Sequence, residues 1–378
     1  MTFAWSSPED LRAVVPHWED LAENAASPNP FYSPGFVLAH LACIGWAENV
    51  QCATVWNTTG DERRLDALAF LYRDDLRWGW PIRTWRSWAN SYFIKFEPLV
   101  RRQTADGAAR ALFAGLSENG RHRTLLLNRA EAWCHEHPNP DLGPAHIIHP
   151  SQRAALIARD DVDGYMKTEV SKKFRANSER NMRRLADRGD LTFKTVRSGP
   201  EVRAAVEDLM RLELAGWKGK QGTSLASSST DKAFGLAALQ AGQCPQISCD
   251  VLSLDGTAVA VSVNLVAGGW LFGFKTAFDE TLKKQSPGSV LHLLGTRAIL
   301  ENKAILGADS TCVPGHPIES VWRDRISCAT TIRSIGAPIS APRVKYVVQT
   351  ETVRSNAKST VKTIYNSASN KKVTTTKA

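Results

Sequence analysis

The chain has 378 residues, of which 43% are hydrophobic and 22% charged. This is ordinary globular composition, and the length allows two domains with proper cores. No apolar run approaches the roughly 20 residues that a membrane-spanning helix needs, and residues 1–11 lack the basic, apolar and small-residue order of an export signal. The net charge of +9 attracts acidic partners, such as CoA, tRNA, phosphates or an anionic membrane face.

The seven cysteines are an odd number and form no CxxC pair. They therefore predict neither a disulfide framework nor a structural zinc site, and free thiols favour a cytoplasmic protein. His135 and His137 form a His-x-His beside a Pro-Asn-Pro turn, and His146 follows them. Because no further ligands accompany these histidines, we predict no metal site.

The first 160 residues alternate between helical and strand patterns, as expected of a first domain. Apolar stripes at helical spacing and short β-favouring runs identify its elements. The predicted helices cover 10–24, 34–44 and 104–119, and the predicted strands cover 51–56, 65–72 and 122–127. Residues 134–160 are predicted to cross to the second half.

The block at residues 76–100 is dense in aromatic side chains, with arginine and lysine between them. It forms a binding wall for a long or ring-bearing substrate, a surface that stacks bases, or simply core with its rim. These alternatives stay open from the sequence. The aromatic residues are Trp78, Trp80, Trp85, Trp88, Tyr92, Phe93 and Phe96.

Residues 162–188 are predicted to form one amphipathic helix with a cationic edge. At helical spacing, four apolar residues share one face, and a narrow polar stripe lies beside it. The stripe is either a solvated face or an edge that binds phosphate, nucleic acid or lipid head groups. The apolar residues are Val170, Phe174, Met182 and Leu185, and the stripe is Lys173, Asn177, Arg180 and Arg184.

The second half predicts a mixed sheet with helices between its strands. Its helices cover 200–217 and 231–240, and its strands cover 190–196, 246–254 and 257–267, followed by a strand from Trp270. Asp255-Gly256 joins two of these strands and is a strong hairpin signal. Three glycines within 216–223 cannot continue a helix and predict a shaped, basic loop.

A helix start follows the Trp270 strand, at Ser286-Pro287-Gly288-Ser289. Ser286 is suited to cap the helix, and Pro287 fits its first turn, where a missing N–H costs nothing. Gly288 lets a ligand approach the backbone closely. A strand that leads into such a helix start holds an anionic group, such as a cofactor pyrophosphate, through free N–H groups and the helix dipole.

Several motifs accompany this order of elements. They are SKKFRANSERNMRRLADRGDLTF at 171–193, LELAGWKGKQGTSL at 212–225, LDGTAVAVSVNLV at 254–266, FKTAFDETLKKQSPGSVL at 274–291 and ADSTCVPGHPIESVWRDR at 308–325, with Trp18 and the PFYSP segment at 30–34 in the first half. The order and these motifs resemble the GCN5-related N-acetyltransferase (GNAT) superfamily. The resemblance is closest to the branch grouped with the CelD/BcsL cellulose-biosynthesis acetyltransferases, covers most of residues 15–335 and is dense after residue 165.

The resemblance implies an α/β (mixed α+β) fold of two tandem GNAT-like domains, each a mixed sheet flanked by helices. We expect an amino-terminal domain at 1–160, a catalytic domain at 161–345 and a basic, disordered tail at 346–378. Fem-type aminoacyl transferases share this duplicated build. By the same resemblance, Gln285, Ser286, Gly288 and Ser289 hold the CoA pyrophosphate, although their spacing and proline depart from the usual family motif.

Acyl transfer needs a group that takes the acceptor's proton and donors that polarise the carbonyl. The candidate bases are Glu213, Asp279, Asp309 and His316. The candidate substrate-binding residues are Trp217, Lys218, Lys220, Lys275 and Arg180. Cys312 is a candidate for a covalent acyl-enzyme, but no paired histidine is evident.

We therefore expect an acyltransferase that uses acyl-CoA as cosubstrate and holds no permanently bound cofactor. The expected acceptor is an amine or hydroxyl, of a lipid such as a sphingoid-type amine or of a polysaccharide precursor. The expected place is the cytoplasm, peripheral to the inner face of the membrane. Two alternatives are a Fem-like transferase that uses charged tRNA, whose binding would fall steeply with salt, and a degenerate GNAT pair that serves as a binding module.

Overall fold

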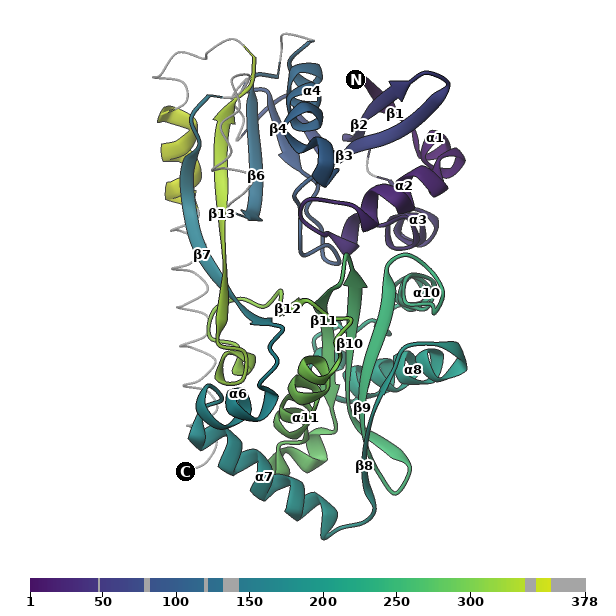
Figure 1. Cartoon of the computed structure of the whole chain (residues 1–378), viewed down its shortest axis with the longest axis vertical. Helices are drawn as coiled ribbons and strands as arrows, with labels where there is room; N and C mark the ends of the chain where they lie inside the picture. Colours follow the sequence, from purple (N-terminus) through teal and green to yellow (C-terminus); the bar gives the residue numbers. More distant parts are fainter. Residues whose placement is uncertain (47, 78–81, 119–121, 132–142, 337–344, 355–378) are drawn as a thin grey trace.

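The computed structural model of the protein describes residues 1–46, 48–77, 82–118, 122–131, 143–336 and 345–354. Within them, strands from both halves of the chain join in one 13-stranded mixed sheet, and helices flank it (Figure 1). The predicted mixed α/β fold is thereby confirmed. None of the helices in these residues is both long and apolar enough to cross a bilayer.

The first half supplies strands and short helices close to the predicted positions. The strands are β1 (Thr2–Ser6), β2 (Val50–Thr59), β3 (Glu62–Asp74), β4 (Thr84–Ser87), β5 (Leu99–Val100), β6 (Thr124–Glu131) and β7 (His146–Ile157). The helices are α1 (Pro8–Ala13), α2 (Val15–Glu23), α3 (Pro34–Cys43) and α4 (Ala105–Ser117), with the 3₁₀ helix η1 (Pro30–Tyr32). The predicted helix at 10–24 is broken at Val14, which is followed by a new helix start with proline in its first turn.

The second half has the predicted order of helices and strands. The helices are α6 (Val162–Thr168), α7 (Lys172–Ala186), α8 (Gly199–Ala215), α9 (Trp217–Lys220), α10 (Ser229–Ala238) and α11 (Pro287–Glu301), with 3₁₀ helices η3 (Glu280–Gln285) and η4 (Pro317–Ser320). The strands are β8 (Leu191–Val196), β9 (Gln246–Leu254), β10 (Thr257–Ala267), β11 (Trp270–Phe278), β12 (Gly307–Asp309) and β13 (Asp324–Ser334).

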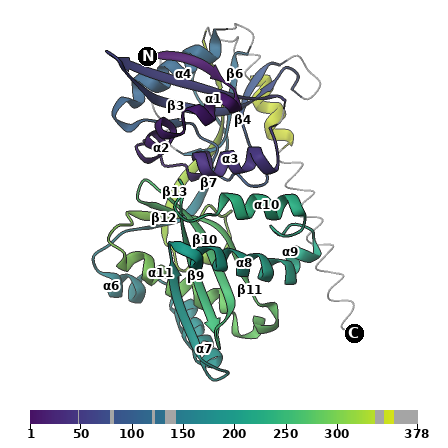
Figure 2. The same cartoon turned by 90° about the vertical axis from the view of Figure 1, so that its right-hand side faces the viewer.

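The sheet passes from one half into the other through β13 and β7. Its order is β1-β2-β3-β4-β6-β13-β7-β12-β11-β10-β9-β8, with β5 paired to β3. Thus β13, from the end of the second half, inserts between β6 and β7 of the first, and β7 pairs with β12. Helices α3 and α10 lie side by side across the same junction (Figure 2).

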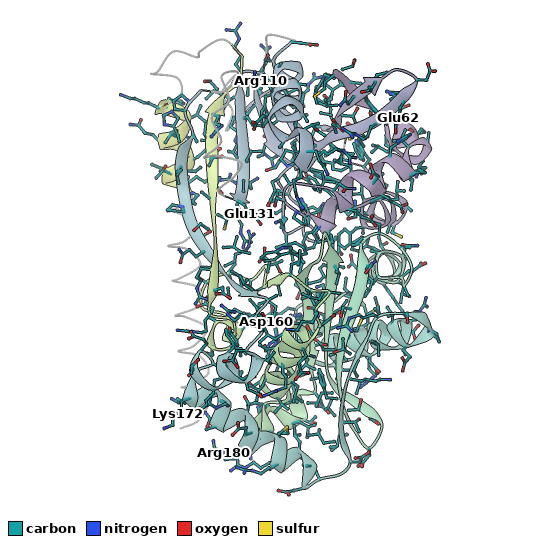
Figure 3. All side chains as sticks on the ribbon, in the orientation of Figure 1. Glu62, Arg110, Glu131, Asp160, Lys172 and Arg180 are labelled. Atoms are coloured by element: carbon teal, nitrogen blue, oxygen red, sulfur yellow. The ribbon has the colours of Figure 1, made fainter. Side chains whose placement is uncertain are left out.

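Buried charges also tie the two halves together. Arg153 on β7 donates to both carboxylate oxygens of Asp309 on β12, at 2.7 and 3.1 Å, and to Glu131 on β6 at 2.9 Å. Lys95 pairs with Glu131 and with Glu97. Figure 3 labels Glu131 at the middle of the molecule, between the halves. Because each buried charge has an opposite partner, the desolvation cost of the group is offset.

The described part of the aromatic block belongs to the core. Trp85, Trp88, Phe93 and Phe96 are buried, which supports the interpretation as core rather than as a binding wall. Tyr92 donates to Asp231 of α10 and stacks on Phe234, so it joins the two halves. Trp78 and Trp80 lie outside the described residues, as do His135 and His137.

Three local predictions differ from the structure. The single helix expected over 162–188 is two helices, because the backbone of Ser171, with φ −47° and ψ 122°, is not helical and α7 starts anew after it. The basic loop at 216–223 contains the short helix α9. A helix covers 345–354 where a disordered tail was expected, because Val347 packs against Leu126 and Ile332 of the sheet. Residues 355–378 lie outside the described part.

Candidate active site

Strands β11 and β12 part to form the mouth of a pocket. They pair in parallel only over Trp270–Phe272 and Gly307–Asp309. Where they diverge, Thr311 Oγ1 donates to the Gly273 carbonyl at 2.6 Å, and a Cβ on Gly273 would lie 2.8 Å from the Ser310 carbonyl oxygen. Beyond Gly273, the edge of β11 that faces β12 pairs with no strand among the described residues. Its backbone amides are therefore available to a ligand, whereas the Thr276 carbonyl in this stretch accepts from Lys218 Nζ at 3.3 Å.

Two residues with left-handed backbones line this pocket, whose volume is about 510 Å³. Ser286 has a φ of 45° and Thr311 a φ of 55°. Such a conformation costs a residue other than glycine about 1–3 kcal/mol, and strain of this kind clusters at functional sites. At Thr311 the cost is offset by an amide hydrogen bond to Asp309 Oδ1 at 2.8 Å.

Helix α11 begins at the pocket, with Pro287 in its first turn as predicted. Ser286 occupies the N-cap position, but its side chain makes no capping hydrogen bond, contrary to expectation. Gly288 and Ser289 line the pocket with Ser286, whereas Gln285 does not. The positive end of the helix dipole therefore faces the pocket, an arrangement that favours a bound anion.

Glu213 holds two lysines at the pocket wall. Its Oε1 accepts from Lys218 Nζ at 2.5 Å and lies 3.7 Å from Lys275 Nζ, and its Oε2 accepts from the Leu225 amide at 3.0 Å. Burial lowers the pKa of Lys275, and the charge of Glu213 opposes that shift. With two ammonium groups and an amide on its carboxylate, Glu213 is suited to position the lysines rather than to take a proton.

His316 and His292 face each other across the pocket, with ring centroids 6.1 Å apart. Burial lowers the pKa of His292 to about 4, and it lowers the pKa of His316 as well. Both rings are therefore neutral near pH 7. His316 Nδ1 accepts from the Ile318 amide at 3.2 Å, so the neutral ring carries its proton on Nε2 and is a hydrogen-bond donor.

Asp250 on β9 also lines the pocket and is only 6% exposed. Thr195 Oγ1 donates to its Oδ1 at 2.7 Å. Burial raises the pKa of Asp250 to about 6, against the lowering effects of Thr195, Arg197 and Asn264. Helix α11 passes over the carboxylate with Gly295, where a Cβ would lie 2.9 Å from Asp250 Oδ2.

The structure brings only some of the predicted site residues together. Trp217, Lys218, Lys275, Ser286, Gly288, Ser289 and His316 line the pocket. Asp309 is engaged by Arg153, and Asp279 accepts from the amide and hydroxyl of Thr281 at the start of η3. Arg180 is exposed on α7 and donates to Asn177. Lys220 is exposed at the end of α9, away from the pocket lining.

Cys312 lines the pocket, and burial raises the pKa of its thiol to about 11. Since the thiolate is the nucleophile, we expect iodoacetamide at pH 8 to alkylate Cys312 about 100-fold more slowly than a free thiol. The rate should rise about tenfold per pH unit as the pH approaches 11. Peptide mass spectrometry measures this. Rapid labelling at pH 8 would contradict the expectation and would revive the covalent acyl-enzyme hypothesis.

Sequence reasoning missed Asp250 and His292. Each carried a signal, because Asp250 is the one charged residue of the strand QISCDVLSL, and His292 interrupts the apolar run of α11. Neither residue matches a motif of known spacing. The two residues line the same pocket only because α11 packs over the sheet.

One segment of the chain matches a known protein family. Residues 172–308 match the family description Acetyltransferase (GNAT) domain. No curated protein matches the chain. Among solved structures, the chain is similar to the C-terminal (DUF2156) domain of a protein from Agrobacterium fabrum assigned as lysylphosphatidylglycerol synthetase, at 11% identity and a TM-score of 0.52, covering 85% of this chain and 92% of that one.

Two further structures share the fold. FemX is 9% identical with a TM-score of 0.52, over 92% of this chain and 100% of that one. A protein of unknown function from Bacteroides thetaiotaomicron is 12% identical with a TM-score of 0.51, over 85% and 97% of the two chains. At such identities the likeness shows the fold alone. Residues 172–308 match a GNAT acetyltransferase domain, and this match confirms the predicted class of enzyme, an N-acyltransferase of the GNAT type.

Proposed function

We propose that this protein transfers an acyl group from acyl-CoA to an amine or hydroxyl. One observation supports this proposal: β11 and β12 diverge beside the start of α11, and residues of both places line the same pocket. The opened strand offers backbone donors to a thioester, and the helix start offers its dipole to a pyrophosphate. The division at residue 160 into an amino-terminal and a catalytic domain belongs to the same proposal.

Under this proposal, each part of the donor has a place in the pocket. The pyrophosphate lies at Gly288 and Ser289, with Lys283 on the same wall. The thioester carbonyl accepts from amides of β11 beyond Gly273, which stabilise the charge that develops on its oxygen. The acceptor's lone pair attacks the carbonyl carbon, and the C–S bond breaks. The acceptor loses one proton and the thiolate takes up one proton, so the step balances. His316 Nε2–H donates to the departing sulfur.

The exposed cations of helix α7 bear on the acceptor and on its location. Several cations of α7 are exposed, and Figure 3 labels Lys172 and Arg180 on its outer side. Such an edge attracts anionic lipid head groups, which supports a lipid acceptor, such as a sphingoid-type amine, at the cytoplasmic face of a membrane. A polysaccharide precursor is the other proposed acceptor, because it also offers an amine or hydroxyl.

The test is a thermal-shift titration with CoA, acetyl-CoA and a long-chain acyl-CoA. A ligand at 100 times its Kd stabilises the folded state by about 2.7 kcal/mol, so we expect a clear rise in Tm for the wild type. Gly288→Trp should abolish the rise, because Gly288 lines the pocket beside the Phe278 ring. Gly107→Trp, on an exposed turn of α4, should retain it. A folded wild type that responds to none of the three ligands refutes the proposal.

A second candidate donor is a charged tRNA, as in the Fem-type aminoacyl transferases. The fold shared with FemX and the exposed cations of α7 favour it. It predicts tRNA binding that weakens about 10³-fold or more between 50 and 200 mM salt. CoA binding at a single pocket would change far less over this range.

A further inference from the structure

Among the residues that the structure describes, the buried acids are paired with cations, with one exception in the pocket. Asp66, Glu97, Glu213, Asp309 and Glu351 each form an ion pair with a lysine or arginine. Asp250 is as buried as these acids, yet it forms no ion pair with any residue that the structure describes. A buried carboxylate without a counter-ion is costly. Asp250 is therefore expected to have a cationic partner when the protein binds its ligand.

Among the described residues, the surroundings of Asp250 are polar, and Arg197 acts on its carboxylate through its charge without forming an ion pair with it. In register across the sheet lie Thr195, Asp250, Ser262 and Thr276. Ser262 Oγ lies 3.0 Å from Thr276 Oγ1 and donates to Asn264 Oδ1 at 3.3 Å. Asp250, Ser262, Asn264 and Thr276 all line the pocket. The row thus forms an oxygen-rich inner wall that faces the ligand.

Helix α11 approaches this wall closely at Gly295. A Cβ there would lie 2.9 Å from Asp250 Oδ2, so any other residue at this position would press on the carboxylate. A metal ion is a poor occupant, because no group of three or more metal-binding side chains occurs in the described residues. A compact organic cation with several N–H donors matches a carboxylate flanked by hydroxyl and amide oxygens.

We infer that the substrate supplies the missing cation, as a protonated amine bound by Asp250 at the inner end of the pocket. The inference rests on the proposed function for the position of the reacting carbonyl, at β11. Strand β9 lies two strands away from β11, a separation of about 10 Å. The bound ammonium is therefore not the nucleophile but a second, non-reacting amine of the acyl group or of the acceptor.

The test compares isosteric ligands with and without the second amine. For the acceptor, acetyl transfer to 1,6-diaminohexane is compared with transfer to heptylamine. For the donor, 6-aminohexanoyl-CoA is compared with heptanoyl-CoA. In one of these two pairs, we expect the wild-type kcat/KM to be at least about tenfold higher for the ligand that carries the extra amine. The pair that discriminates identifies the source of the ammonium.

Asp250→Asn keeps the shape of the side chain and removes its charge, so it should reduce this preference to about one. Asp255→Asn is the matched control, because Asp255 lies in the β9–β10 turn outside the pocket lining, and it should keep the wild-type preference. Calorimetric titration with CoA should give the same affinity for all three proteins. Loss of preference in both variants would overturn the role of Asp250.

The possible failures are distinguishable. If CoA binds the wild type but neither ligand pair discriminates, the inference is wrong and the proposed function stands. If CoA does not bind, the proposed function fails, and direct titration with 1,6-diaminohexane decides on the subsite alone. The cation site is then supported if the wild type and Asp255→Asn bind 1,6-diaminohexane and Asp250→Asn binds it with at least tenfold lower affinity. Equal binding by all three proteins refutes it.

Discussion

Replacing Arg153 with methionine is expected to lower the free energy of unfolding by about 3–5 kcal/mol, the usual cost of breaking a buried ion pair. Arg153 is 1% exposed and bonds Asp309 and Glu131, which lie on different strands. Asp309 is fully buried, and its further partner among the described residues is the Thr311 amide. Removing the guanidinium therefore leaves an uncompensated charge at the junction of the two halves.

Equilibrium unfolding in urea measures this change. Arg297→Met is the matched control, since Arg297 is 42% exposed on α11 and pairs with Asp163 and Glu301 at the surface. Its removal should change stability by less than about 1 kcal/mol. Adding Asp309→Asn to Arg153→Met should recover part of the loss, because the second change removes the stranded charge. A loss below about 1 kcal/mol for Arg153→Met would show that the pair is not needed.

Asp250→Asn is expected to stabilise the unliganded protein by up to about 3 kcal/mol at pH 8. The pKa of Asp250 is raised from 3.8 to about 6 in the folded protein, and each pKa unit corresponds to about 1.36 kcal/mol. Between these two values the folded state binds more protons than the unfolded state, so wild-type stability falls as pH rises from about 4 to about 6. Above pH 6 the full cost of the buried carboxylate is present.

The pH dependence distinguishes this effect from a change in packing. The advantage of Asp250→Asn should shrink as the pH falls from 8 to 4, where the wild-type carboxyl is protonated too. Urea unfolding at pH 8, 6 and 4.5 measures it, with Asp255→Asn as the control that shows no such trend. Arg197 is the charged group that opposes the shift. A difference that stays constant with pH would mean that Asp250 is not the titrating group.

Elements governed by local chemistry were predictable from the sequence. The Asp255-Gly256 turn, with both residues at positive φ, joins β9 and β10 as expected of an Asp-Gly hairpin. Pro287 starts α11 because a first-turn position needs no amide donor. The order of helices and strands in the second half was sufficient to indicate the GNAT fold. That fold in turn located the helix start at the pocket.

Roles set by distant partners were not predictable. Asp309 looked like a candidate base, but Arg153, 156 residues earlier in the chain, engages its carboxylate. Glu213 was another candidate, and the return of the chain through α9 and β11 places Lys218 and Lys275 on it. In both cases the sequence identified an acid but not the cation that pairs with it. The partner that fixes its charge and access comes from another part of the fold.

The sequence by itself determined the elements, the mixed sheet and the helix start that faces the pocket, because turn, cap and periodicity preferences act over a few neighbouring residues. Only the tertiary structure decided which acids are neutralised and which one remains without a cation. Burial and ion pairing depend on groups far apart in the chain, so the difference between Asp309 and Asp250 exists only once β7, β9, β12 and α11 have packed together.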